Sequence, residues 1–398
     1  MQTNLAAFIR DTPEGREADA ILRTCVHCGF CNATCPTYQL LGDELDGPRG
    51  RLYLMKQMFE GEAVSANTRL HLDRCLTCRN CETTCPSGVH YTQLLELGRH
   101  TVDALVPRPV WARLKRWGLR RFLLTRWLFG PAVWLGRLIG RLPTATASAA
   151  MPAGQHARKV ILLQGCVQPA LDPGIDAALA RVLDRLGIQV VRAGQAGCCG
   201  ALSHHLDARA EAAAQMRRNL DAWWPLIEAG AEAVVASASG CGLHLKDYGR
   251  LLADDPAYAE RAAVLAKLVR DPAELLAGAD LSRFRPTQPR RVAFHPPCTL
   301  QHGLQIRGVV EGILTGLGHC LTPVTDSHLC CGAAGTYSLL QPELADALRR
   351  RKLDALTDGG PELIVTANIG CQVHLAAATK LPVAHWLTLL DNAADRHK

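Results

Sequence analysis

The chain has 398 residues, of which 48% are hydrophobic and 20% charged, so its composition is that of a globular protein of two to four domains. It carries 17 cysteines and a formal net charge of +7. The N-terminal stretch MQTNLAAFIRDTPEGREADA lacks the basic start and long apolar run of a secretory signal, and no apolar run reaches the roughly 18 residues of a membrane span. We therefore expect a cytoplasmic protein, in which clustered cysteines bind metals more often than they form disulfides.

Residues 1–100 contain two stretches with the same cysteine spacing. TCVHCGFCNATCPTY holds Cys25, Cys28, Cys31 and Cys35, and RCLTCRNCETTCPSG holds Cys75, Cys78, Cys81 and Cys85. Both read C-x2-C-x2-C-x3-C-P, which is the bacterial ferredoxin spacing. Structural zinc is the competing interpretation, but zinc sites usually present two C-x2-C pairs separated by a longer loop. The doubled spacing favours two [4Fe–4S] clusters in a mainly helical, ferredoxin-like domain.

In the ferredoxin pattern the fourth cysteine of each motif binds the other cluster. If this rule holds, the ligands cross between the two motifs. One cluster then takes Cys25, Cys28, Cys31 and Cys85, and the other takes Cys75, Cys78, Cys81 and Cys35. The long insertion YQLLGDELDGPRGRLYLMKQMFEG predicts a loop and a helix between the motifs and does not prevent this crossing.

Residues 101–157 form a basic, tryptophan-rich segment that ends in a linker. Residues 104–171 include eleven Lys or Arg and no acidic residue, and four tryptophans (111, 117, 127 and 134) interleave with the basic residues of 108–141. Such helices can lie on an anionic membrane, here the cytoplasmic face of the inner membrane. Alternatively, this is a connecting pair of helices whose tryptophans pack on the domains. We expect no nucleic-acid partner, and the first two interpretations stay open.

Residues 158–285 and 286–398 repeat one arrangement. Apolar strands alternate with helices, which predicts a small parallel α/β sheet in each repeat. A cysteine follows the first strand, a Cys-Cys-Gly comes after a second short strand, and another cysteine follows a third strand. These residues are Cys166, Cys198, Cys199 and Cys241 in the first repeat and Cys298, Cys330, Cys331 and Cys371 in the second.

The recurrence of this cysteine set favours a metal or redox role over inert packing, although free cysteine also packs as a small hydrophobe. We expect the strand-end cysteines near helix N-termini, where thiolate is stabilised. His244 and His374 each lie three residues after a cysteine of the set and are either ligands or packing residues. Cys320 lies outside the pattern, and we expect it in the core.

The sequence contains no motif typical of an enzyme that makes or breaks covalent bonds in a substrate. There is no G-x-G-x-x-G after a predicted strand and no nucleophile elbow. We therefore expect no catalytic residue and no flavin or NAD on this chain. Its expected work is single-electron transfer, with the protein setting the reduction potential.

Two stretches, CVHCGFCNATCPTYQLLGDELDGPRGRLYLMK and LDRCLTCRNCETTCPSGVHY, are followed by two Cys-Cys-Gly domains. Across essentially the whole chain this resembles the glycolate oxidase (glycolate dehydrogenase) iron–sulfur subunit family. Relatives of that family include a subunit of anaerobic glycerol-3-phosphate dehydrogenase and heterodisulfide reductase. The resemblance implies two flavin-type partner subunits that oxidise glycolate to glyoxylate, with electrons passing through this chain to a quinone or another acceptor.

Two questions remain open within this resemblance. Heterodisulfide reductase carries C-x-x-C in the last element, where it helps to bind a non-cubane cluster, whereas both repeats here carry C-x-x-H. Further iron–sulfur clusters in the C-terminal repeats are therefore one alternative, and structural remnants are the other. The electron donor is also open, because an equivalent subunit could serve glycerol 3-phosphate or lactate. A stand-alone thiol/disulfide redox protein is the third hypothesis.

Overall fold

The computed structural model describes residues 1–140, 142–143, 145 and 151–394. Packing divides the chain into two compact units, here called the first unit (Met1–Trp117 with His328–Lys352) and the second unit (Gly118–Ser327 with Leu353–Lys398). The first unit is built from helices, and the second contains two small parallel sheets, so the predicted mixed fold is confirmed. Within the described ranges, no helix is long and apolar enough to cross a membrane. The domain boundaries predicted after residues 100, 157 and 285 stay predictions.

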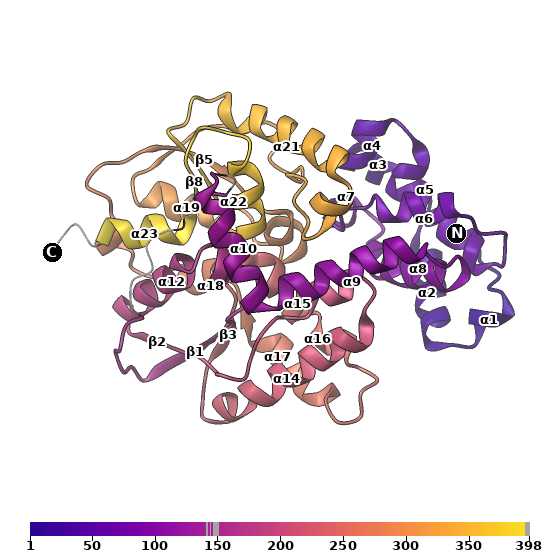
Figure 1. The fold of residues 1–398 in the computed structure, drawn as a ribbon, viewed down its shortest axis with the longest axis horizontal. Helices are drawn as coiled ribbons and strands as arrows, with labels where there is room; N and C mark the ends of the chain where they lie inside the picture. The colour runs from indigo at the N-terminus through magenta and orange to yellow at the C-terminus, as the bar shows by residue number, and fades with distance from the viewer. Residues whose placement is uncertain (141, 144, 146–150, 395–398) are drawn as a thin grey trace. The chain divides into compact units, whose positions relative to one another are not determined.

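The helices of the first unit surround one core (Figure 1). They are α1 (Ala7–Arg10), α2 (Pro13–Thr24), α3 (Phe30–Ala33), α4 (Pro36–Leu41), η1 (Glu44–Asp46), α5 (Pro48–Phe59), α6 (Ala66–Asp73), α7 (Asn80–Thr84), α8 (Tyr91–Leu105) and α20 (Tyr337–Leu340). The side chains of Thr12 and Ser65 cap α2 and α6. Met55, Phe59 and Leu94 are fully buried where α5 and α8 pack together. This core supports the two loops that carry the cysteine motifs.

The second unit contains two four-stranded parallel sheets with the same topology. The strand orders are β2-β1-β3-β4 and β6-β5-β7-β8, so the first strand of each repeat pairs with the second and the third. Val160 pairs with Val190 and Ala233, and Val292 pairs with Leu321 and Leu363. The strands are β1 (Arg158–Leu162), β2 (Ile188–Val191), β3 (Ala233–Val235), β4 (Val269–Arg270), β5 (Arg291–His295), β6 (Cys320–Leu321), β7 (Leu363–Thr366) and β8 (Val383–His385). The internal repeat predicted from the sequence is therefore present in the fold.

Helices accompany both sheets (Figure 1). In the first repeat they are α11 (Gln168–Leu171), α12 (Gly174–Arg185), α13 (Ala201–His205), α14 (Arg209–Glu228), α15 (Ser239–Lys246), α16 (Tyr248–Leu251), α17 (Ala259–Leu268), α18 (Pro272–Leu276) and η2 (Ser282–Phe284). In the second they are the π-helical turn η3 (Thr299–Gly303), α19 (Val309–Gly316), α21 (Pro342–Thr357), α22 (Ile369–Ala376) and α23 (Trp386–Ala394). The boundaries between the units fall within α9 (Val110–Leu124), after Ser327 and within α21.

The two repeats share one hydrophobic core in the second unit. Val160 and Leu179 of the first repeat belong to the same buried cluster as Val365 and Leu387 of the second. Two arginines of α12, Arg181 and Arg185, form ion pairs with Asp391 of α23, whose side chain is almost fully buried. These contacts pack the two sheets of the second unit together.

The expectation that Cys320 is a core residue is wrong. Its side chain is exposed at the start of β6, which has two residues and lies at the edge of its sheet. An edge strand has a neighbouring strand on one side only, so a strand this short can leave a side chain open to solvent.

The basic segment folds into two helices, α9 (Val110–Leu124) and α10 (Arg126–Leu138), as the connecting-pair interpretation predicts. The second half of that interpretation, tryptophans packed on the domains, is wrong. The exposed fractions of Trp111, Trp117, Trp127 and Trp134 are 71%, 50%, 75% and 64%. Arg108 and Arg116 instead turn inward to ion pairs with Asp73.

Replacing Leu179 by alanine tests the shared core. The side chain is fully buried, so Leu179→Ala should lower the free energy of unfolding by about 2–5 kcal/mol through lost transfer energy and a residual cavity. Urea unfolding followed by circular dichroism measures this. Leu339→Ala is the control, since Leu339 is 49% exposed and should change the stability by less than about 0.5 kcal/mol. Equal stability of both variants would contradict the shared core.

Candidate functional site

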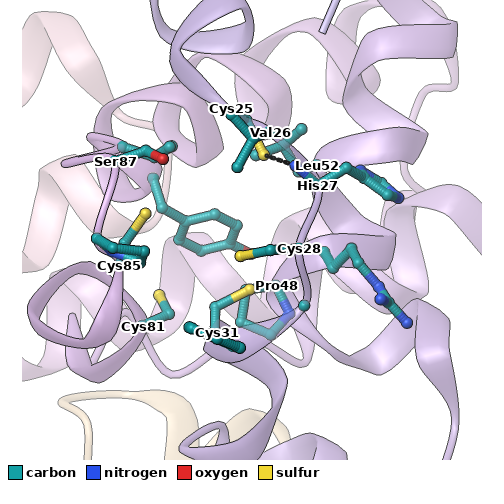
Figure 2. A pocket seen from close by; sticks show the side chains of 16 residues that line it. Cys25, Val26, His27, Cys28, Cys31, Pro48, Leu52, Cys81, Cys85 and Ser87 are labelled. Carbon is teal, nitrogen blue, oxygen red and sulfur yellow. Dashed lines mark hydrogen bonds between the residues drawn. The ribbon is translucent and has the colours of Figure 1, made fainter.

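Cysteines from both N-terminal motifs line one pocket of the first unit. Cys25, Cys28 and Cys31 come from the first motif, and Cys81 and Cys85 come from the second. Figure 2 shows these five side chains around one space.

The two motifs meet through equivalent short helices. α3 holds the third cysteine of the first motif, and α7 holds the third cysteine of the second. The hydroxyls of Thr34 and Thr84, three residues after those cysteines, lie 3.1 Å apart. This contact between equivalent residues places the end of each motif beside the loop of the other.

Four cysteines line a second pocket of the same unit. Three of them, Cys35, Cys75 and Cys78, do not line the first pocket, and the fourth is Cys81. Cys81 thus lines both pockets. Burial, followed by repulsion from Cys78 and Cys75, raises the pKa of the Cys81 thiol well above its ordinary value, and Cys35 adds to this effect. Electrostatically, Cys81 therefore belongs with the other cysteines of the second pocket.

In the first pocket, burial and neighbouring thiols also raise the pKa values of cysteines. Burial raises the pKa of Cys31 to about 11, with further contributions from Cys25, Cys85 and Cys28. Burial also raises the pKa of Cys25, and negative charge on Cys85 or Cys28 would raise it further. The thiols that interact in this way are those of the predicted crossed set.

The donor chemistry of both pockets fits an iron–sulfur cluster. Several thiolates in one partly buried pocket repel one another, and a cationic metal centre removes that penalty. An all-sulfur donor set selects soft metals or iron–sulfur clusters, and the spacing favours the clusters. The side chains named by the crossed ligand sets are together in the structure, and their role as ligands stays a prediction.

Both cysteine loops depend on left-handed backbone. His27 and Gly29 in the first loop have φ of 59° and 86°, and Thr77 and Arg79 at the equivalent positions have 52° and 60°. The amide N–H of His27 donates to the Cys25 sulfur at 3.3 Å, and that of Thr77 donates to the Cys75 sulfur at 3.4 Å. Hydrogen bonds of this kind stabilise the thiolate. Positive φ is rare for a β-branched residue such as threonine, so only Gly29 carried a sequence signal for this geometry.

In the first repeat, four cysteines lie in a chain of thiol contacts within the second unit. Hydrogen bonds join Cys166 to Cys198, Cys198 to Cys199, and Cys199 to Cys241. Bonds from Cys166 and Cys199 lower the pKa of Cys198, and the pKa values of the two donors are raised. Cys198 is therefore the sulfur at which its neighbours favour negative charge. As predicted, Cys166 follows the end of β1, and Cys241 lies in the first turn of α15.

The Cys-Cys-Gly turn of the first repeat is held from behind by two buried side chains. The Asn219 side-chain amide donates to the Cys198 carbonyl oxygen at 2.8 Å, and the Tyr248 hydroxyl donates to that of Cys199 at 2.6 Å. Gly200 has a φ of +100°, which favours glycine. These supporting residues carry no sequence signal, because only the folded chain brings α14 and α16 to the turn.

Histidines also gather beside this turn. His244 is buried, and its ring centroid lies 5.4 Å from that of His204 and 6.2 Å from that of His205. The sequence analysis considered His244 and missed the other two, which lie four and five residues after Gly200. Ligation by His244 or His374 stays a prediction.

The second repeat distributes its cysteines between the units. Cys298 directly precedes η3, and Cys371 lies in the first turn of α22, both in the second unit, whereas Cys330 and Cys331 belong to the first unit. The local geometry of the turn is that of the first repeat. The Gly332 N–H donates to the Cys330 sulfur at 3.4 Å, as the Gly200 N–H does to Cys198 at 3.5 Å.

Comparisons with known proteins agree with this arrangement. Residues 21–89 match the family described as "4Fe-4S dicluster domain", and residues 160–246 and 292–376 match "Cysteine-rich domain". The chain is 52% identical over 406 aligned residues to the glycolate oxidase iron–sulfur subunit of Escherichia coli (strain K12), with 100% of each chain covered. The chain belongs to the family of glycolate oxidase iron–sulfur subunits. The predicted resemblance is thereby confirmed.

More distant members extend the comparison. A probable glycolate oxidase iron–sulfur subunit of Bacillus subtilis (strain 168) is 29% identical, over 89% of this chain and 88% of its own. Lactate utilization protein A of Exiguobacterium sp. is 24% identical, over 54% of this chain and 88% of its own. The dicluster and cysteine-rich domains support iron–sulfur clusters as cofactors of this chain.

The crossed ligand sets predict matched spectra for pairs of serine variants. Cys35→Ser should remove the same electron paramagnetic resonance (EPR) signal as Cys78→Ser, because both residues line the second pocket. Cys85→Ser should instead match Cys28→Ser. The measurement is the EPR spectrum of each reduced, anaerobically purified variant. If Cys35→Ser matches Cys28→Ser, the ligands do not cross.

Proposed function

We propose that this chain is the electron-transfer subunit of a glycolate-oxidising complex, with one [4Fe–4S] cluster in each pocket of the first unit. The observation that carries this proposal is the lining of two neighbouring pockets by the eight N-terminal cysteines, with Cys81 lining both. Such clusters store and pass single electrons. Two sites that share a lining residue are close enough for electrons to move between them.

The residues of the chain would hold and insulate these clusters. For the first pocket the ligands are Cys25, Cys28, Cys31 and Cys85, and for the second they are Cys75, Cys78, Cys81 and Cys35. Loop amides donate to the Cys25 and Cys75 sulfurs, and buried apolar side chains of α5 and α8 exclude water behind them. Hydrogen bonds to sulfur and burial are two means by which a protein sets a reduction potential.

The reaction partners are proposed from the family. The Escherichia coli relative is named as a subunit of glycolate oxidase, which supports glycolate as the ultimate electron donor. We propose that two flavin-type subunits oxidise glycolate to glyoxylate and reduce this chain, which passes the electrons to a quinone or another acceptor. No flavin is proposed on this chain.

A further metal centre is proposed in the cysteine-rich repeats. In the first repeat, Cys166, Cys198, Cys199 and Cys241 form a chain of thiol contacts near the buried His244, and the contacts lower the pKa of Cys198. This arrangement supplies soft donors for an additional iron–sulfur cluster. The equivalent set in the second repeat is proposed by the likeness of the two Cys-Cys-Gly turns.

We also propose that α10 lies on the surface of an anionic membrane. The exposed residues of α10 on one face, Trp127, Pro131, Trp134 and Leu138, recur at helical spacing and are all apolar, whereas Phe129 and Val133 face inward. A helix with its tryptophans turned outward has the amphipathic pattern of an interfacial helix. Two exposed basic residues of the second unit, Arg121 and Arg126, complement anionic headgroups. The clustered thiols support a cytoplasmic location.

Anaerobic purification of the complex by a tag on this chain tests the electron-transfer proposal. The complex should hold at least about eight irons per copy of this chain, as two [4Fe–4S] clusters require. Adding glycolate should generate the EPR signals of reduced clusters. Glycerol 3-phosphate and lactate, added separately, should not.

The control for iron content is Cys320→Ser, which changes an exposed cysteine outside the proposed sites and should retain all the iron. Reduction by lactate or glycerol 3-phosphate in place of glycolate would overturn the proposed donor. Zinc without iron would overturn electron transfer altogether.

Vesicle binding tests the membrane proposal. The Trp127→Ala/Trp134→Ala double variant removes two exposed indoles and should weaken co-sedimentation with phosphatidylglycerol-containing vesicles at least tenfold, because each indole is a large apolar anchor. The wild-type protein should bind more weakly at high salt and to neutral phosphatidylcholine vesicles. Leu339→Ala is the control, since it removes an exposed side chain from another helix. Unchanged binding by the double variant would overturn the membrane proposal.

A further inference from the structure

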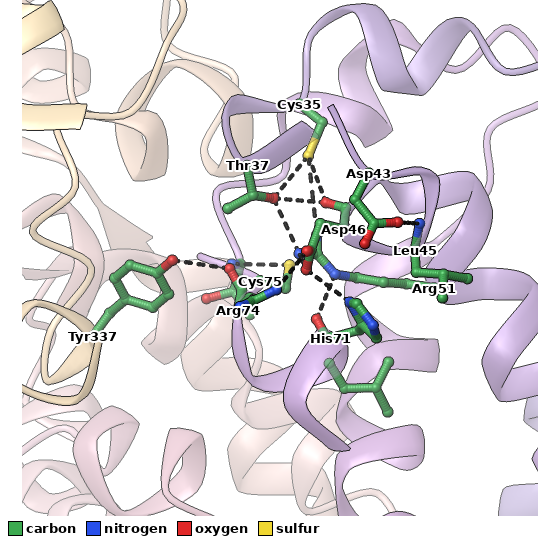
Figure 3. A network of polar contacts seen from close by, with 12 residues as sticks. Cys35, Thr37, Asp43, Leu45, Asp46, Arg51, His71, Arg74, Cys75 and Tyr337 are labelled. Carbon is green, nitrogen blue, oxygen red and sulfur yellow. Dashed lines mark hydrogen bonds and ion pairs between the residues drawn. The ribbon is translucent and has the colours of Figure 1, made fainter. Parts of the chain in front are cut away.

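A buried network of charged side chains lies beside the second pocket (Figure 3). Asp46 at the end of η1 is fully buried, forms ion pairs with Arg51 and Arg74, and has one carboxylate oxygen 3.1 Å from the Nδ1 of His71. The Arg51 side chain is fully buried as well. A buried ionic group is costly unless its partners compensate it fully, so this network requires a reason of its own.

Arg51 connects the network directly to the second pocket. Its Nε donates to the His71 carbonyl oxygen at 2.7 Å, and one Nη donates to the Thr37 hydroxyl at 3.1 Å. The other Nη lies 4.0 Å from the Cys35 sulfur, at the outer limit of a hydrogen bond to sulfur. The Thr37 hydroxyl lies 3.3 Å from the same sulfur. Arg51 is also part of the pocket lining, with Cys35, Cys75, Cys78 and Cys81.

The network holds two cations close to one buried carboxylate. Two guanidinium groups, on Arg51 and Arg74, form ion pairs with Asp46, and the exposed Asp43 carboxylate lies within 4.8 Å of Asp46 and His71. Arginine stays protonated in proteins, so Arg51 keeps its charge although its side chain is fully buried. The network therefore places a buried cation beside the sulfurs of the second pocket.

The first pocket has a different electrostatic environment. The arginine in its lining, Arg49, is one third exposed and forms an ion pair with Glu44. Its charge is balanced by one partner and screened by solvent. The two arginines of the GPRGR stretch thus produce one surface ion pair and one buried cation.

We propose that Arg51 and Asp46 together set the reduction potential of the cluster in the second pocket, with Arg51 raising the potential and Asp46 lowering it. This inference rests on the proposed function, because it requires a cluster in the second pocket. The reduced cluster gains one electron and becomes one charge more negative. A buried cation near its ligand sulfurs stabilises that reduced form, and a buried carboxylate destabilises it.

The two residues predict shifts of opposite sign. Arg51→Met removes the cation and should lower the midpoint potential of the second cluster, and Asp46→Asn removes the anion and should raise it. Each change should alter the ratio of oxidised to reduced cluster at a fixed potential by about tenfold, which is 59 mV for a one-electron couple. Arg51→Lys keeps the charge and should shift this ratio by less than about threefold. The measurement is a dithionite redox titration of the purified complex followed by EPR.

Opposite signs distinguish an electrostatic role from a structural one. Damage to packing would move both variants in the same direction or remove the cluster from both. Arg49→Met is the matched control, because it removes an arginine from the first pocket and should leave the second cluster's potential unchanged. Should Arg51→Met fail to assemble, Asp46→Asn and Arg51→Lys still carry the test.

The outcomes separate this inference from the proposed function. A wild-type complex that lacks the second cluster's signal would overturn the proposed function and this inference with it. A wild-type complex with both signals, and variants whose second midpoint is unmoved or moves in the same direction, would overturn the inference alone. Opposite shifts confined to the second cluster would establish it.

Discussion

The packing of several ionisable sulfurs into a small, partly buried volume is the constraint on which the first unit depends. Burial raises the pKa of Cys31 to about 11, and neighbouring sulfurs contribute to that rise. Without a compensating cation such a group of thiols stays protonated, and with one it becomes a strong ligand set. The loop amides and the buried arginine bring donors or positive charge towards these sulfurs.

The two pockets are alike in backbone and different in charge. Each loop places left-handed residues at equivalent positions and directs an amide to the first cysteine sulfur. The surroundings diverge, because Arg49 reaches solvent and a single acidic partner, and Arg51 is enclosed with Asp46, Thr37 and Cys35. A near-symmetric pair of sites can therefore acquire unequal affinities for an electron.

The second unit meets a different requirement, which is to keep cysteines at the carboxyl ends of two small sheets. Neither four-stranded sheet is large, and one hydrophobic core is shared between the repeats. The ion pairs of Arg181 and Arg185 with Asp391 reinforce the same contact. In the first repeat this frame lets Asn219 and Tyr248 hold the Cys-Cys-Gly turn from behind. The residues 328–352 of the second repeat pack in the first unit, where the Tyr337 hydroxyl donates to the Arg74 carbonyl oxygen.

Sequence by itself determined the cysteine spacing, the internal repeat, the parallel sheets and the family, because these depend on local periodicity and on residues close in the chain. Tertiary structure decided which side chains far apart in sequence share a site. The supporting Asn219 and the histidines beside His244 gave no pattern, and Cys320 looked like core but lies on an edge strand. The tryptophans of α9 and α10 likewise could not be assigned to core or surface, since helical spacing alone leaves the buried face undefined. Arg51 is buried and Arg49 is not, because α5 turns the face that carries Arg51 towards the interior. Only the packing of α5 against η1 and α6 determines which face that is.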